Sequence, residues 1–103
     1  MEDIDPTDTE ALAKAAKARD TRNRNAQDTE AADIAWLMSS KRGRRILWRQ
    51  LERAGVYRSS FNTNSMAMAF AEGERNAGLR LLASIHEAAP DQFTTMLKES
   101  REQ

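Results

Sequence analysis

The chain has 103 residues, of which 40% are hydrophobic and 31% charged, and its 16 basic and 16 acidic side chains cancel. A chain of this length forms one domain at most, and its four Gly, two Pro and 6% aromatic residues favour helices over turn-rich strands. The absence of cysteine excludes disulfides, thiolate nucleophiles and cysteine-based zinc sites. No apolar run approaches the roughly 18 residues that a membrane span requires. We therefore expect an all-α protein without a membrane span.

Residues 1–27 differ in composition from the rest of the chain. The opening MEDIDPTDTE carries five acids and lacks the basic and apolar regions of a signal peptide. The alanine-rich stretch that follows favours helix, but Leu12 is its one large apolar side chain and cannot anchor a core. We expect an N-terminal arm that is extended or marginally helical, disordered in the isolated protein, and ordered on a partner.

Residues 28–103 are predicted to fold as a helical domain, a small bundle of about four helices. Capping residues at helix starts, and glycine or proline at helix ends, divide this segment. The first predicted helix is capped by Asp28 or Thr29 and ended by Ser39 and Ser40, and the second runs from about Lys41 to Ala54 and is closed by Gly55. The third runs from Asn64 or Ser65 to about Ala88. The fourth begins at Pro90 and has Phe93, Met96 and Leu97 on its buried face.

The third predicted helix has an apolar arc that covers nearly half of its circumference. Gly73 and Gly78 fall on this arc, although a glycine in a helix interior costs roughly 1 kcal/mol against alanine. Close approach of a neighbouring helix would justify this cost, so both glycines are predicted at a tight crossing. The central seam of the arc consists of Met66, Phe70, Gly73, Ala77, Leu81 and Ala88.

The second predicted helix lies in the most basic part of the chain. Residues 41–58 carry seven basic side chains against the single acid Glu52. At about 100° per residue, one side of the helix is apolar and the other basic. Guanidinium groups bind carboxylates and phosphates bidentately, so the basic side is a predicted partner-binding surface, with a solvated charged face as the alternative. The apolar side holds Gly43, Leu47, Leu51 and Ala54; the basic side holds Arg42, Arg45, Arg49 and Arg53, with Lys41, Arg44 and Arg58 enlarging the positive field.

The sequence offers little for catalysis. The single histidine, His86, precedes Glu87, and no serine is placed to be activated by it. His86, Glu87 and Asp91 lack the spacing of metal ligands. Gly43 is not part of a phosphate-binding loop, because no GK[ST] ending follows it. We expect no catalytic residues, no metal and no cofactor.

A helix-turn-helix interpretation fails at the recognition helix. That helix would begin in the stretch SSFNTNSMAMAFAEG, whose methionine and alanine side chains give almost nothing with which to read base edges. The basic residues lie in the supporting helix instead. DNA contact would therefore be limited to phosphates, and it would be weak and sensitive to salt.

Three elements of the sequence are specific when taken together. They are the helix GRRILWRQLERAGVY, the following SF with the asparagine-containing loop at Asn64, and the motif EGERNAGLRLL. With these elements, residues 43–99 resemble a family of small proteins from short-tailed bacteriophages, first described in a Bordetella phage. Within the motif, the exposed face permits a hydrogen-bonded ladder at i, i+4 and i+8. The motif residues are Glu72, Gly73, Arg75, Asn76, Gly78 and Arg80, of which Glu72, Asn76 and Arg80 have the ladder spacing; the alternative is that they only stabilise the helix surface.

The resemblance implies a phage-encoded protein, not known as an enzyme, whose gene tends to lie among packaging, portal and head genes. Together with the basic side of the second predicted helix, it leads to the hypothesis of a virion component, made in the host cytoplasm, that docks in several copies on a portal or adaptor ring. A weak phosphate contact with packaged DNA is compatible with this role. The alternative function is a DNA-binding packaging or regulatory factor that uses the arginine-rich helix.

Overall fold

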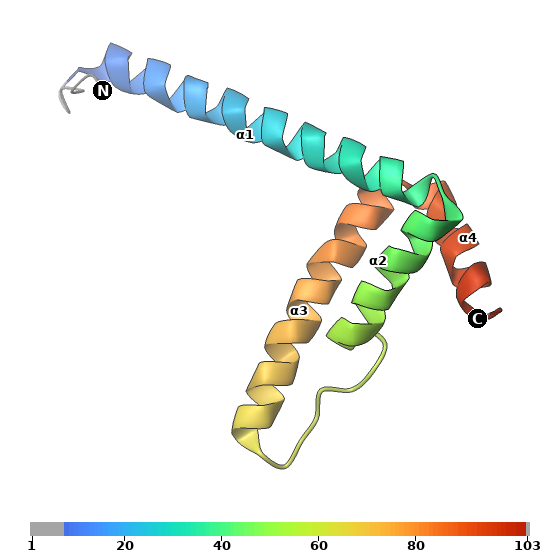
Figure 1. Ribbon diagram of the computed structural model, residues 1–103. Coiled ribbons are helices and arrows are strands. Elements are labelled where there is room, and N and C mark those ends of the chain that lie inside the picture. The colour runs from blue at the N-terminus through green and yellow to red at the C-terminus, as the bar shows by residue number, and fades with distance from the viewer. Residues whose placement is uncertain (1–7, 103) are drawn as a thin grey trace. The chain divides into compact units, whose positions relative to one another are not determined.

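The computed structural model describes residues 8–102, which form four helices (Figure 1). No strand occurs within these residues, so the predicted all-α class is confirmed. The acidic residues 1–7 of the predicted arm lie outside the described part of the chain. The helices are α1 (Thr9–Met38), α2 (Lys41–Ala54), α3 (Ser65–Ala88) and α4 (Pro90–Ser100).

The chain divides into two compact units, Met1–Glu30 and Ala31–Gln103. In the first unit, α1 begins at Thr9, where the Asp8 carboxylate accepts hydrogen bonds from the backbone N–H groups of Glu10 and Ala11 at 3.1 and 3.0 Å. The predicted start at Asp28 or Thr29 is therefore wrong. The Thr29 hydroxyl donates instead to the Asn25 carbonyl oxygen at 2.9 Å, as a residue inside a helix does. Of the two forms expected for the arm, residues 9–27 adopt the helical one.

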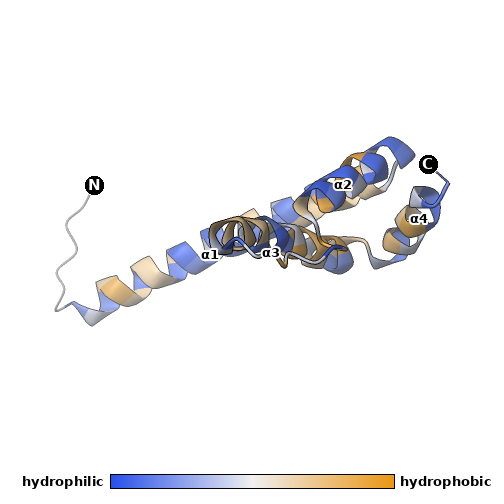
Figure 2. Cartoon of the chain, turned by 90° about the horizontal axis from the view of Figure 1, so that it is seen from below, coloured by the Kyte–Doolittle hydropathy of each residue, from blue (hydrophilic) through white to orange (hydrophobic). Residues whose placement is uncertain are grey.

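The second unit contains the hydrophobic core, built from α2, α3, α4 and the last two turns of α1. Figure 2 shows α2 as a largely hydrophilic helix whose apolar residues occupy only part of its surface. That part faces the core, as predicted, because Leu47 and Leu51 are buried there. Met96 is fully buried on α4, between the half-buried Phe93 and Leu97. The buried core residues are Ile34, Met38, Leu47, Leu51, Val56, Ile85 and Met96.

The ends of α2 and α3 agree with the sequence prediction. The Ser40 hydroxyl caps α2 by accepting from the Gly43 N–H at 3.0 Å, and Gly55 ends the helix with a left-handed φ of 77°. The Asn64 side chain caps α3 by accepting from the Ala67 N–H at 3.0 Å. These caps satisfy backbone groups that have no partner inside a helix.

Two of the helical glycines permit close contacts, whereas a third does not. A Cβ atom on Gly78 would lie 2.5 Å from Ala54 Cβ and 2.6 Å from Val56 Cγ2, so Gly78 marks the predicted tight crossing of α2 and α3. A Cβ on Gly43 would overlap the backbone carbonyl of Leu37. Gly73 has nothing within 4 Å of its Cβ position, so its predicted place in a crossing is wrong.

The first half of the predicted α3 seam is also exposed. Met66 is 82% exposed, Phe70 is 69% exposed, and Ala77 is exposed as well. The reason is helix length: α3 has 24 residues and α2 has 14, so α2 cannot cover the whole of α3. Toward the other end of α3, Ile85 is fully buried and Leu81 and Leu82 pack against the core.

Candidate partner-binding surface

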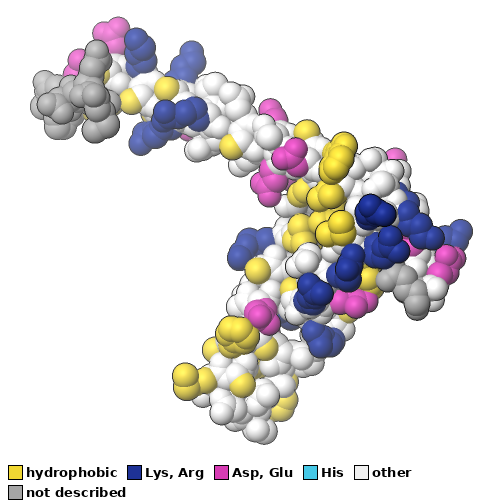
Figure 3. Space-filling model, viewed as in Figure 1, with side chains coloured by type: hydrophobic (Ala, Val, Ile, Leu, Met, Phe, Trp, Pro, Cys, Tyr) yellow, Lys and Arg dark blue, Asp and Glu magenta, His cyan; other side chains and the backbone are white. Residues whose placement is uncertain are grey.

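Four arginines line the outer face of α2. Arg42, Arg45, Arg49 and Arg53, which we call the arginine row, are all exposed. Within residues 8–102, none of the four side chains has a hydrogen bond or ion pair, since the one salt bridge found there belongs to Arg44. Figure 3 shows lysine and arginine side chains gathered over α2. The row therefore leaves four guanidinium groups available to a partner.

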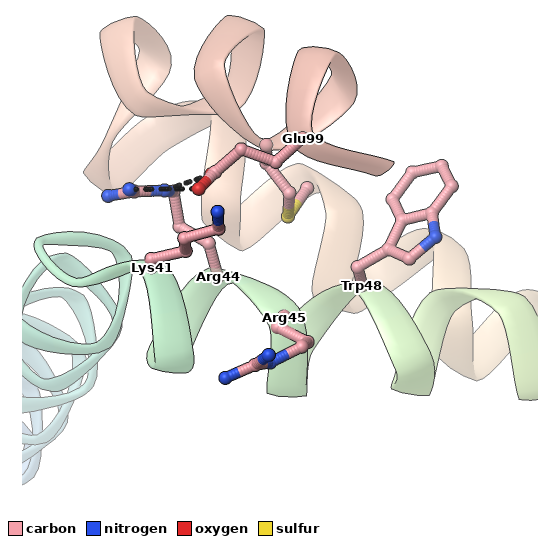
Figure 4. A pocket seen from close by; sticks show the side chains of 6 residues that line it. Lys41, Arg44, Arg45, Trp48 and Glu99 are labelled. Atoms are coloured by element: carbon pink, nitrogen blue, oxygen red, sulfur yellow. Dashed lines mark hydrogen bonds and ion pairs between the residues drawn. The ribbon is translucent and has the colours of Figure 1, made fainter. Parts of the chain in front are cut away.

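Arg44 was predicted to extend this surface, but the structure gives it a partner inside the protein. Its Nε donates to Glu99 Oε1 at 2.6 Å, and its Nη2 to Glu99 Oε2 at 3.3 Å, which joins α2 to α4 (Figure 4). Nη1 donates to the Met38 carbonyl oxygen at 2.8 Å and to Gln92 Oε1 at 3.3 Å. The side chains of Arg44 and Glu99 are only 12% and 15% exposed. Arg44 thus holds helix ends together and is not part of the arginine row.

The charge state of Glu99 follows from this contact. The hydrogen bond from Arg44 lowers the pKa of the Glu99 carboxyl, partial burial opposes the shift, and the positive charges of Arg44, Lys41 and Arg45 add to the lowering. The carboxylate is therefore ionised at neutral pH and neutralises Arg44. Lys41 and Arg45, from the same helix as Arg44, both lie below the pair in Figure 4.

Arg58 combines a structural contact with exposure. Its Nη2 donates to the Glu52 carbonyl oxygen at 2.9 Å, at the carboxyl end of α2, where a positive charge is favourable. The residue remains exposed. Nearby, Trp48 and Tyr57 stack with ring centroids 5.4 Å apart, and the Trp48 indole donates to the Glu52 carboxylate. These contacts fix the start of the loop between α2 and α3.

The motif residues of α3 separate into different environments. Glu72, Asn76 and Arg80 are exposed, and within the described chain no hydrogen bond links them, so the ladder that their spacing permits is not formed. Arg75 is half-buried and faces a hollow of about 220 Å³ between α3, the end of α2 and the loop after it. The sequence did not predict that Arg75 would meet Arg53 and Arg58 there.

The residues considered for chemistry lie apart from the arginine row. His86 on α3 is exposed and packs on Phe93 of α4, with ring centroids 4.1 Å apart. Between residues 8 and 102, no three side chains of metal-ligating type come together. None of the described helices is both long and apolar enough to cross a membrane.

A model of the Bbp19-like phage protein family matches residues 34–98, more than half of the chain. The chain belongs to this family. The match confirms the resemblance found in residues 43–99, and it includes α2, α3 and most of α4. The arginine row and the hollow beside Arg75 therefore belong to the Bbp19-like region, whereas most of α1 lies before it. No curated protein and no solved structure matches the chain.

Proposed function

We propose that this protein is a non-enzymatic virion component that docks on an acidic surface of a portal or adaptor protein. The observation that carries the proposal is the exposed arginine row, whose side chains have no partner within residues 8–102. The opposite face of α2 is committed to the core through Leu47 and Leu51. Membership of a phage protein family supports a phage-associated role.

A protein partner is favoured over DNA by large apolar side chains that are exposed in the same unit as the row. Phe61, Met66 and Phe70 are 77%, 82% and 69% exposed at the start of α3 and in the loop before it. Aromatic residues, methionine and arginine are enriched in protein interfaces, where aromatic and arginine side chains contribute most of the binding energy. Phosphate groups gain nothing from contact with apolar side chains. A protein surface with acidic and apolar patches would bind both the arginine row and these apolar side chains.

If several copies bind to a symmetric ring, a small contact surface on each copy is enough for stable attachment. The row extends from Arg42 to Arg53, eleven steps along α2, or about 16 Å at roughly 1.5 Å per step. A contact of this size is weak by itself, but copies held on a portal or adaptor ring present it repeatedly, and linked weak contacts bind together. A weak contact with packaged DNA phosphates is compatible with this arrangement.

The proposal is tested by incorporation into purified particles, measured by mass spectrometry before and after DNA release. A variant with Arg42, Arg45 and Arg49 changed to glutamate should be excluded from particles, because like charges would face an acidic partner. The matched control makes the same charge change at three exposed positions elsewhere, and it should be incorporated normally. Normal incorporation of the row variant would contradict the proposal. The control positions are Arg80, Lys98 and Arg101.

The second candidate is a DNA-binding packaging or regulatory factor, and the same four exposed guanidinium groups favour it. Binding through phosphates would weaken steeply with salt, with a slope set by the number of phosphates contacted. Fluorescence anisotropy with duplex DNA across a salt series measures this slope. If the parent protein binds duplex DNA with sub-micromolar affinity, and the variant with Arg42, Arg45 and Arg49 changed to glutamate loses this affinity but is still incorporated into particles, DNA binding replaces docking as the proposed function.

A further inference from the structure

A groove beside the arginine row runs between α2 and α3. It consists of two hollows of about 220 and 230 Å³, which share Arg53, Ala54 and Glu74. Each hollow is smaller than the roughly 300–1,000 Å³ of a typical ligand pocket. Each hollow has room for a few side chains of a bound segment.

The charged lining of the groove is positive. It contains Arg53, Arg58 and Arg75 against the single acid Glu74, a net charge of plus two from three arginines and one glutamate. Arg53 and Arg75 have no hydrogen bond or ion pair within residues 8–102, and Arg58 uses Nη2 for the Glu52 carbonyl. Most N–H groups of these guanidiniums thus have no partner in the described part of the chain and can pair with carboxylates of a ligand.

The uncharged lining points to a peptide. Ala54, Ala71 and Ala77 contribute small apolar side chains, which leave room for an aliphatic group. Gln50 offers an amide that bonds equally well to peptide N–H and C=O groups. Glu74 can accept hydrogen bonds from the N–H groups of a peptide backbone, and a sugar–phosphate backbone has no such donors, so a peptide fits the groove better than a nucleic acid strand does.

We propose that this groove binds an acidic peptide segment of a partner protein. Carboxylates of the segment pair with Arg53, Arg58 and Arg75, and an aliphatic side chain between them occupies the alanine-lined hollows. The inference rests on the proposed docking function and deepens it. It names the chemistry of the partner as a linear segment in which Asp or Glu residues flank an aliphatic residue.

The test is an NMR titration of the full chain with a capped synthetic peptide, Glu-Asp-Leu-Asp-Glu. The backbone amides of Ala71, Arg75 and Ala77 should shift during the titration. The matched peptide Gln-Asn-Leu-Asn-Gln keeps the size and the leucine but lacks the carboxylates, and it should leave these amides unchanged. Inorganic phosphate and a short duplex DNA serve as the competing anions.

Two variants locate the binding site. Arg75→Glu should weaken peptide binding by at least about tenfold, because it places like charge against the carboxylates. Arg53→Glu, at an exposed position, should have the same effect and covers the case in which a change at half-buried Arg75 disturbs the fold. Arg80→Glu makes an equal charge change on the same helix outside the groove, and its affinity for the peptide should match that of the parent.

Equal shifts with the neutral peptide, no shifts with the acidic one, or tighter binding of phosphate or DNA in the groove would overturn the inference. The docking proposal is judged separately. If the Arg42, Arg45 and Arg49 variant is excluded from particles but the groove binds no peptide, the docking proposal is supported and the groove proposal is rejected. Peptide binding in the groove by a protein that is absent from particles would do the reverse.

Discussion

Arg44 Nε lies 2.6 Å from Glu99 Oε1 and ties α2 to α4 across 55 positions of the chain. The contact is bidentate and well shielded, since both side chains are less than one-sixth exposed. Arg44 also donates to the Met38 carbonyl at the end of α1. One guanidinium therefore connects three helix ends in a unit whose core contains seven buried hydrophobic residues.

Glu99→Gln should destabilise the protein by about 1.5–3 kcal/mol at pH 7, the range for hydrogen bonds to charged groups. The Glu99 pKa in the folded protein is below its usual value of 4.5. The stabilisation is therefore complete above the unfolded pKa and is lost as the pH falls through the folded pKa. Urea denaturation at pH 7 and between about pH 5 and 3 should show a smaller acid-induced loss in Glu99→Gln than in the parent protein.

Glu102→Gln is the control for this prediction, because Glu102 is an exposed acid near the end of the same helix. Its denaturation midpoint should follow that of the parent protein at each pH. If Glu99→Gln and the parent lost the same stability on acidification, the contact would contribute nothing to the pH dependence.

Gly78→Ala should destabilise the protein by roughly 1–3 kcal/mol, the range for overpacking. The added methyl group would collide with Ala54 and Val56 where α2 and α3 cross. Gly73→Ala is the matched change on the same helix, at a site with open space around the Cβ position. It should raise stability by roughly 0.4–1 kcal/mol, because alanine loses less backbone entropy in a helix. Thermal or urea denaturation measures both, and effects of the same sign would contradict the assigned crossing.

Asn64→Ala should cost about 1 kcal/mol through loss of the α3 cap. The Asn64 Oδ1 accepts from the Ala67 N–H at 3.0 Å, and an alanine leaves that donor to water. Asn76→Ala, on the exposed face of the same helix, removes an asparagine without removing a cap. The difference in unfolding free energy between the two variants isolates the cap, and equal stabilities would show that α3 starts without it.

The bounds of α2 and α3 were predictable because local residues determine them. Ser40, Gly55 and Asn64 act on backbone groups within a few positions of themselves, so their effect can be seen in the sequence. The start of α1 was missed for the opposite reason. Asp8 caps a helix whose residues up to Glu30 have no buried face, and a search for apolar periodicity does not detect such a helix.

The parts of the candidate site that depend on contacts between helices could not be predicted from the sequence. Arg44 and Arg45 are adjacent in the sequence, yet the turn of about 100° between them places one against Glu99 and the other in solvent. The groove likewise depends on how α2 packs on α3, which brings Arg53 next to Arg75. The arginine row needed no such information, because its spacing and the apolar residues opposite it lie in one helix.

Changing Arg42, Arg45, Arg49 and Arg53 together to glutamate should leave the helical fold intact. All four are exposed, and within residues 8–102 they stabilise nothing through side-chain hydrogen bonds or ion pairs. Circular dichroism should therefore show the helix content of the parent protein, with a melting temperature near that of the parent. The proposed function assigns the row to partner binding, so incorporation into particles and any DNA affinity should fall while the fold persists. A large loss of helix content would show instead that the row supports the structure, and that its guanidinium groups have partners within the chain.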